Sequence, residues 1–152
     1  MLKLLKSYCV FIDNSMEKLF DKEFVDKLFV EAAESPRLRQ NHDLRNSAKD
    51  TSQRMLNALM PDTVVPIHQH TETDETVICL CGKLEEILYE RMEATNEDGI
   101  SEVMFKETAR YLLCPEQGTY GMQIHAGVWH TVNVIEPSVI FEAKDGAYVP
   151  AK

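Results

Sequence analysis

The feature that most restricts the possible folds is a long series of short strand patterns in the second part of the chain. Between residues 53 and 144, apolar runs alternate with turn signals such as Met60–Thr63, Gly82 and Asn96–Gly99. Many short strands at this spacing are typical of an all-β sandwich or barrel. The expected strands cover residues 53–59, which also fits a helical turn, and 64–70, 75–81, 84–92, 103–105, 109–113, 121–124, 131–135 and 138–144.

The first 52 residues follow another pattern, and we expect them to form an N-terminal extension on a barrel of residues 53–152. Apolar side chains recur there at helical intervals, which predicts one main helix over about residues 15–35. Asn14 or Ser15 would cap the start of this helix. Pro36 would end it, because the residue before a proline avoids the helical conformation.

Composition and charge exclude several classes of protein. Hydrophobic residues make up 44% of the chain, which is typical of a globular domain and not of a disordered one. The formal net charge of -9 repels phosphate backbones and anionic membrane surfaces. No apolar run reaches the ~18 residues of a membrane span. Lys6 interrupts the apolar start Met1–Val10, so we expect an edge strand there and not a signal peptide.

The cysteines indicate a reducing compartment. Their spacing matches neither a CxxC redox motif nor a zinc knuckle, and the four positions are Cys9, Cys79, Cys81 and Cys114. Buried, reduced thiols in a cytoplasmic protein are therefore the expectation.

Three histidines and one glutamate are spaced as the ligands of a divalent metal. His68 and His70 are two residues apart in an expected strand, which places both imidazoles on one face. Glu75 begins the next expected strand, and His130 follows far downstream. Two closely spaced imidazoles, a nearby carboxylate and a remote third imidazole make a plausible first coordination shell.

Such a site typically leaves one or two positions for water or substrate. The mixed nitrogen and oxygen ligands suit Zn, Fe, Mn, Ni or Co, and the ligands alone do not choose among them. Two alternatives stay open at this point: Glu72 as the carboxylate ligand, and Cys79 as a fifth, soft ligand.

Two segments resemble the motifs of the cupin family: His68-x-His70-(x)4-Glu75-(x)6-Gly82 and Gly127-x-x-His130-x-x-Asn133. In the second segment, His125 stands where that motif usually has proline, and the asparagine comes one residue early. The resemblance covers about residues 53–148. It implies a jelly-roll-like double-sheet β-barrel, one divalent metal ion per chain bound by the four residues named above, and pairing of two chains into a homodimer.

A narrower resemblance is to the WbuC-type cupin metalloproteins, which are associated with bacterial O-antigen and surface-polysaccharide gene clusters. It rests on the segments Ser35–Arg39, Gln53–Leu59, Gly127–Thr131 and Phe141–Tyr148 together with the His68-Gln-His70 pair. The chain departs from that pattern at Asp74 and at His125-Ala126. The open four-ligand site and the basic stretch favour a metal-dependent enzyme that acts on a sugar or nucleotide-sugar by an isomerase-like or epimerase-like reaction, and the resemblance places it in polysaccharide synthesis. A non-catalytic small-molecule-binding cupin and an Fe(II)-dependent dioxygenase are the alternatives.

The residues that could surround the metal follow from strand parity and charge. Glu142 and Lys144 share one face of the last expected strand, where they could act in acid–base catalysis and anion binding, or form a surface ion pair. The irregular, basic stretch 36–53 could cap the barrel mouth and bind an anionic sugar or nucleotide, or lie in solvent. Its candidate residues are Arg37, Arg39 and His42.

The remaining candidates are weaker. Asn57, Gln123 and Tyr148 are expected to help bind the substrate, His125 to lie at the rim, and Trp129 to pack outward against a second sheet or subunit. If the metal ligands face inward, then strand parity turns four further residues inward, namely Pro66, Val77, Cys79 and Cys81.

Overall fold

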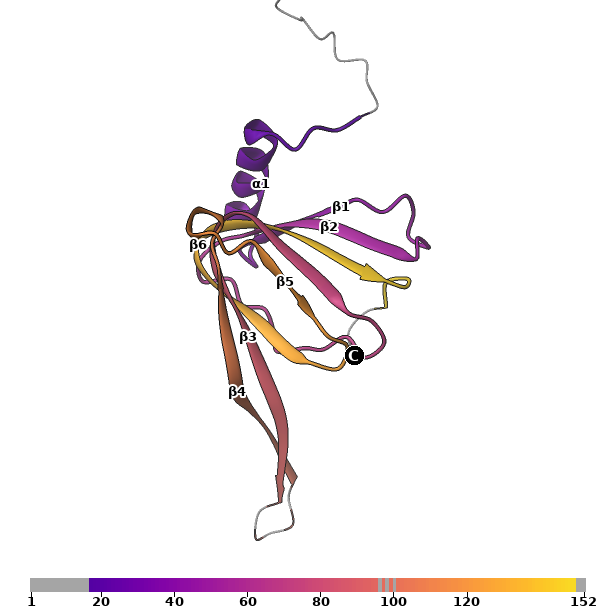
Figure 1. Ribbon diagram of the computed structural model, residues 1–152, viewed down its shortest axis with the longest axis vertical. Coiled ribbons are helices and arrows are strands. Elements are labelled where there is room, and N and C mark those ends of the chain that lie inside the picture. Colours follow the sequence, from indigo (N-terminus) through magenta and orange to yellow (C-terminus); the bar gives the residue numbers. More distant parts are fainter. Residues whose placement is uncertain (1–16, 96, 98, 100, 150–152) are drawn as a thin grey trace, which may run out of the picture.

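The computed structural model describes residues 17–95, 97, 99 and 101–149 (Figure 1). Within this part of the chain, one helix and one short 3-10 turn accompany six strands. The elements are α1 (Lys22–Glu34), β1 (Arg39–Asp43), β2 (Ser52–Leu59), β3 (Glu75–Thr95), β4 (Ser101–Leu113), η1 (Pro115–Gln117), β5 (Gly121–Ile124) and β6 (Trp129–Asp145). The predicted mostly β fold with an N-terminal helix is therefore confirmed.

The strands form one antiparallel sheet that curves strongly around a central space (Figure 1). Their order is β1-β2-β6-β3-β4, and β5 pairs with β3. The start of β3 lies between β5 and β6, whereas its later part lies between β4 and β6. The β3–β4 hairpin extends away from the barrel. None of the helices in the described ranges is long and apolar enough to cross a membrane.

In three places, two expected strands form one long strand: 75–81 with 84–92 in β3, 103–105 with 109–113 in β4, and 131–135 with 138–144 in β6. The sheet stays paired through the turn signals inside β3, β4 and β6, because bulges absorb the irregular residues. Gly82 is the clearest of these positions, because residues with a side chain rarely adopt its φ of +89°. A Cβ there would lie 2.2 Å from the carbonyl oxygen of Pro137, so only glycine fits.

The strand expected over residues 64–70 is absent. Only His68 is in a β-bridge there, with His130. The strand expected over 53–59 is confirmed as β2, and the helical-turn alternative is wrong.

The helix is shorter than expected at its start. It begins at Lys22, and the carboxylate of its N-cap, Asp21, accepts a hydrogen bond from the backbone N–H of Phe24 at 2.9 Å. The helix ends at Glu34, as the proline at position 36 predicts. Several earlier expectations lie outside the described residues: the caps Asn14 and Ser15, the edge strand Met1–Val10 and the thiol of Cys9.

The basic stretch after the helix is not irregular throughout. Residues 39–43 form β1, which pairs antiparallel with β2 in the register Asn41↔Asn57. The sheet thus continues across the expected boundary between residues 52 and 53.

Two apolar cores lie on opposite faces of this sheet. One packs α1 against its outer face and contains Leu28 and Ala32 of the helix with Leu56 and Ala58 of β2. The other lies inside the barrel. Leu56 and Ala58 of β2 face the helix. Because side chains alternate along a strand, Asn57 and Leu59 face the interior.

The bulges change the predicted parity of β3. Val77 and Cys79 belong to the interior core, as expected. Cys81 instead packs with the helix-side core, because the register shifts between Cys79 and Cys81. Pro66 is exposed, since its segment is not a strand. The inward placement expected for Cys81 and Pro66 is therefore wrong.

Candidate metal centre

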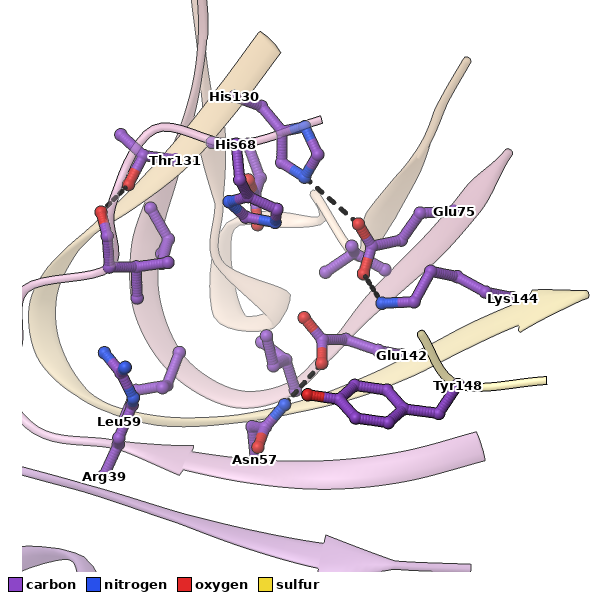
Figure 2. A pocket seen from close by; sticks show the side chains of 15 residues that line it. Arg39, Asn57, Leu59, His68, Glu75, His130, Thr131, Glu142, Lys144 and Tyr148 are labelled. Atoms are coloured by element: carbon purple, nitrogen blue, oxygen red, sulfur yellow. Dashed lines mark hydrogen bonds and ion pairs between the residues drawn. The ribbon is translucent and has the colours of Figure 1, made fainter. Parts of the chain in front are cut away.

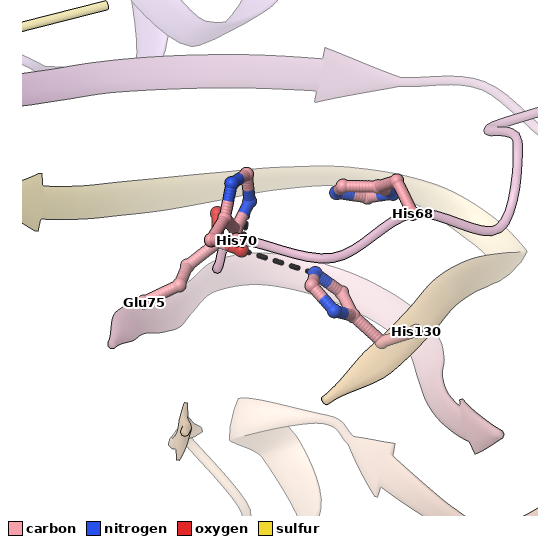
Figure 3. A group of neighbouring side chains, drawn as sticks. All are labelled: His68, His70, Glu75 and His130. Carbon is pink, nitrogen blue, oxygen red and sulfur yellow. Dashed lines mark hydrogen bonds and ion pairs between the residues drawn. The ribbon is translucent and has the colours of Figure 1, made fainter. Parts of the chain in front are cut away.

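The four expected ligands come together at one place (Figure 3). The candidate ligand atoms of His68, His70, Glu75 and His130 all lie within 4.8 Å of one another. Glu75 is the first residue of β3 and His130 is near the start of β6, while the other two lie on the connection between β2 and β3. Two backbone hydrogen bonds between His68 and His130, of 3.0 and 2.8 Å, hold that connection in place.

The backbone sets the direction in which two of the imidazoles present their lone pairs. Nδ1 of His68 lies 3.0 Å from the carbonyl oxygen of Pro66, and Nδ1 of His130 lies 3.0 Å from that of Val128. A carbonyl oxygen only accepts, so each Nδ1 must carry the proton and donate. In each ring, Nε2 is then the nitrogen that remains to bind a metal.

Glu75 is the buried carboxylate of the group, with an exposed fraction of 2%. Its Oε2 lies 3.1 Å from Nε2 of His130 and 3.0 Å from Nε2 of His70. Lys144 Nζ donates to its Oε1 at 2.9 Å. Burial raises the pKa of Glu75, but the contacts with His130, His70 and Lys144 outweigh burial and hold the pKa below its ordinary value. Glu75 is therefore ionised at neutral pH.

The four side chains are arranged as a set of metal ligands. The imidazole nitrogens and the carboxylate oxygen that face one another here are all atoms that can bind a metal through a lone pair. Within the described residues, Nε2 of His70 is buried without a hydrogen-bond partner, because its contact with Glu75 is not in hydrogen-bond geometry. A divalent cation would satisfy all four groups at once. The residues present thus fit one ion with three nitrogen ligands and one oxygen ligand.

A cavity of about 310 Å³ opens beside this group inside the barrel (Figure 2). His68, Glu75 and His130 form part of its wall, so a metal bound there would be reached from the cavity. Further polar groups of the lining come from Arg39, Asn57, Glu86, Thr131, Glu142, Lys144 and Tyr148. The apolar part of the wall consists of Leu59, Val65, Val77, Val132 and Ile140.

Glu142 and Lys144 face this cavity from β6, as their shared parity predicts. The alternative of a surface ion pair is wrong, since Lys144 contacts Glu75 and Glu142 accepts a hydrogen bond from the side-chain amide of Asn57. Burial, and then the negative charge of Glu75, raise the pKa of Glu142 to about 7. The catalytic roles of Glu142 and Lys144 stay a prediction.

The three basic residues expected at the barrel mouth lie in different places in the structure. Arg39 lines the cavity, and one of its guanidinium N–H groups donates to the carbonyl of Val64 at 2.6 Å. His42 is turned toward the helix, where its ring lies 5.1 Å from that of Phe24. Arg37 is exposed and not part of the lining. The structure thus brings only Arg39 to the ligand site.

Asp74 and His125, where the chain departs from the WbuC-type pattern, contact each other. Nδ1 of His125 lies 3.1 Å from Oδ2 of Asp74, which also accepts from the amide of Gln123 at 2.9 Å. His125 is exposed, as its expected rim position requires. Gln123 borders a second, open hollow beside Asp74 and not the cavity, so its expected place in the pocket is wrong.

The other candidates are placed as follows. Tyr148 lines the cavity, with the guanidinium of Arg45 5.6 Å from its ring. Glu72 is exposed and Cys79 is part of the apolar core, so neither alternative ligand belongs to the group of four. Trp129 packs against Phe105 of the β3–β4 hairpin, with the ring centroids 5.0 Å apart.

One cavity residue was missed from the sequence. Glu86 of β3 has an exposed fraction of 3% and lines the cavity. Burial, and then the negative charges of Glu142 and Glu75, raise the pKa of Glu86 well above its ordinary value. Glu86 lies two residues after Leu84, so the two share one face of the strand, but a carboxyl at such a position is ordinarily exposed.

Comparison with known proteins gives a family and a fold. The family model described as "Domain of unknown function (DUF6016)" matches residues 20–99. A search of curated proteins found no match. A conserved protein of unknown function from Streptococcus pyogenes has a similar structure, with a TM-score of 0.52 and 11% identity over 76% of this chain and 80% of that chain. The fold is thus a mostly β, cupin-like fold with one N-terminal helix.

Two further solved structures are similar at lower scores. Oxalate oxidase in complex with the substrate analogue glycolate has a TM-score of 0.49 and 10% identity, and the match covers 76% of this chain and 55% of that one. KdgF from Halomonas sp. has a TM-score of 0.47 and 13% identity, over 75% of this chain and 84% of that one.

Proposed function

The chain belongs to the DUF6016 family, and we propose that it is a divalent-metal-dependent cupin that acts on a small sugar or nucleotide-sugar. One observation carries this proposal. Three imidazoles and a buried carboxylate converge on the wall of a cavity large enough for a small molecule. The place of this activity in bacterial surface-polysaccharide synthesis rests on the resemblance to WbuC-type cupins.

Each part of the cavity has a task in this proposal. A bound ion would polarise a carbonyl or hydroxyl oxygen of the ligand. Lys144 fixes the orientation of Glu75 through its hydrogen bond of 2.9 Å. Glu142, held by Asn57, presents a carboxyl to the cavity as the proton-transfer group. Arg39 supplies positive charge for an anionic group of the ligand.

The alternative of a non-catalytic binding protein has one observation in its favour. Both candidate catalytic side chains already have protein partners, since Lys144 contacts Glu75 and Glu142 contacts Asn57. In that case the ion and Arg39 hold a ligand without converting it. The homodimer and the cytoplasmic location stay predictions, and sedimentation of the purified protein would test the former.

The metal is tested first, on the purified full chain. Elemental analysis should find one divalent ion per chain, and cobalt titration of the metal-stripped protein should give a saturable visible spectrum. His68→Ala and His130→Ala should lose this spectrum while the far-ultraviolet circular dichroism stays unchanged. His125→Ala is the matched control, because that imidazole is exposed and contacts Asp74 instead of the ligands. Wild-type protein that binds no divalent ion would refute the proposal.

Turnover is tested next, with the metal-loaded protein and a panel of sugar acids and nucleotide-sugars. Product detected by mass spectrometry, and lost in His130→Ala, supports the enzyme. Binding measured by calorimetry without any product supports the binding protein instead.

A further inference from the structure

Glu86 is a buried residue whose carboxyl group has no partner among the described side chains. Its exposed fraction is 3%, and it lines the cavity. No hydrogen bond or ion pair to its carboxyl is found among the described residues, whereas Glu75 and Glu142 each have a partner. Moving such a group from bulk water into a narrow cavity without a protein partner costs free energy. The partner that would offset this cost is a ligand bound in the cavity.

The surroundings of Glu86 determine the kind of partner it can take. The negative charges of Glu142 and Glu75 oppose its ionisation, and so does its burial. A neutral carboxyl offers one O–H donor and one carbonyl acceptor, which together match an alcohol hydroxyl group. A cationic partner is disfavoured, because a neutral carboxyl carries no charge with which to pair.

We propose that Glu86 recognises a hydroxyl group of a small hydroxy acid of the sugar-acid class, whose carboxylate lies toward the metal centre and Arg39. This inference rests on the proposed function and deepens it by naming the ligand class and a residue that selects it. The cavity volume of about 310 Å³ is at the lower end for small-molecule sites. A monosaccharide-sized acid fits inside it, whereas a nucleotide group would have to extend through the mouth.

The test compares two probes that share a carboxylate and differ in hydroxyl groups, D-gluconate and hexanoate. Calorimetry is done on cobalt-loaded protein. Wild-type protein should bind gluconate at least tenfold more tightly than hexanoate. Glu86→Met should lose at least tenfold in gluconate affinity and little in hexanoate affinity. Glu86→Gln should keep most of the gluconate affinity, because the amide also has a donor and an acceptor.

Two controls separate recognition from a structural role. Glu85→Met changes the neighbouring residue, whose side chain faces outward to Arg110 and Asn133, and should leave gluconate affinity unchanged. In the absence of ligand, Glu86→Met should melt at a higher temperature than wild type, since an unpaired buried carboxyl is replaced by an apolar side chain. A lower melting temperature, or failure to fold, would mean that Glu86 stabilises the barrel and would overturn the proposal.

The results also distinguish this inference from the proposed function. Wild-type protein that does not bind cobalt refutes the proposed function. Wild-type protein that binds cobalt but does not prefer gluconate refutes only the role of Glu86, as does a Glu86→Met protein that keeps the full preference. Loss of cobalt binding in Glu86→Met would assign the residue to the metal centre and would also overturn the inference.

Discussion

Replacement of Lys144 by methionine should destabilise the metal-free protein far more than the metal-bound protein. In the metal-free protein, Lys144 is the cationic partner of Glu75, at 2.9 Å; Glu75 is buried and Lys144 largely so, with side-chain exposed fractions of 2% and 11%. Removing one member of a buried ion pair typically costs about 3–5 kcal/mol. Glu75 keeps its contacts with His70 and His130, so we expect the lower end, about 3 kcal/mol.

The metal changes this cost because a divalent ion supplies the positive charge that Glu75 then lacks. We expect the loss in the cobalt-loaded protein to fall by about half, to about 1.5 kcal/mol. Binding and folding are thermodynamically linked, so the difference of about 1.5 kcal/mol must appear as roughly tenfold tighter cobalt binding by Lys144→Met. Lys144 would thus orient Glu75 at the expense of metal affinity.

The assay is thermal unfolding with chelator and with saturating cobalt, together with cobalt titration. A loss of about 3 kcal/mol corresponds to a melting temperature lower by roughly 6–12 °C for a chain of this size. Lys22→Met is the matched control, since its ion pair with Asp26 is exposed and should change stability by less than about 0.5 kcal/mol. Equal losses with and without cobalt, or weaker cobalt binding by Lys144→Met, would refute the reasoning.

Three further predictions concern stability. Gly82→Ala should fold poorly or lose about 2 kcal/mol or more in urea unfolding, because of the φ of +89° and the contact with Pro137; unchanged stability would mean that the bulge is not strained. Asp21→Ala should lose about 1 kcal/mol with the cap of α1, whereas Asp21→Asn should lose little. The folded-state pKa of Glu86 is raised, so its protonated form favours folding and wild-type stability falls as pH rises above about 4.5. The stability of Glu86→Gln relative to wild type should therefore increase with pH, and a pH-independent difference would contradict the raised pKa.

The sequence by itself determined the features that depend on local spacing. Alternation and turn residues predicted β structure from residue 53 onward, and Pro36 predicted the helix end. The spacing of His68, His70 and Glu75, with His130 far downstream, was enough to identify the four side chains that the fold brings within 4.8 Å. These predictions succeed because residue type and chain geometry limit them directly.

Only the tertiary structure decided which faces of the strands are inside. Parity predicts a face only along an unbroken strand, and the bulge after Cys79 turned Cys81 to the helix side. His42 was lost from the site because β1 pairs with β2 and α1 packs beside it, a long-range arrangement that local spacing does not encode. Glu86 became recognisable only when the curved sheet enclosed it, because a carboxyl is exceptional by its burial and not by its place in the sequence.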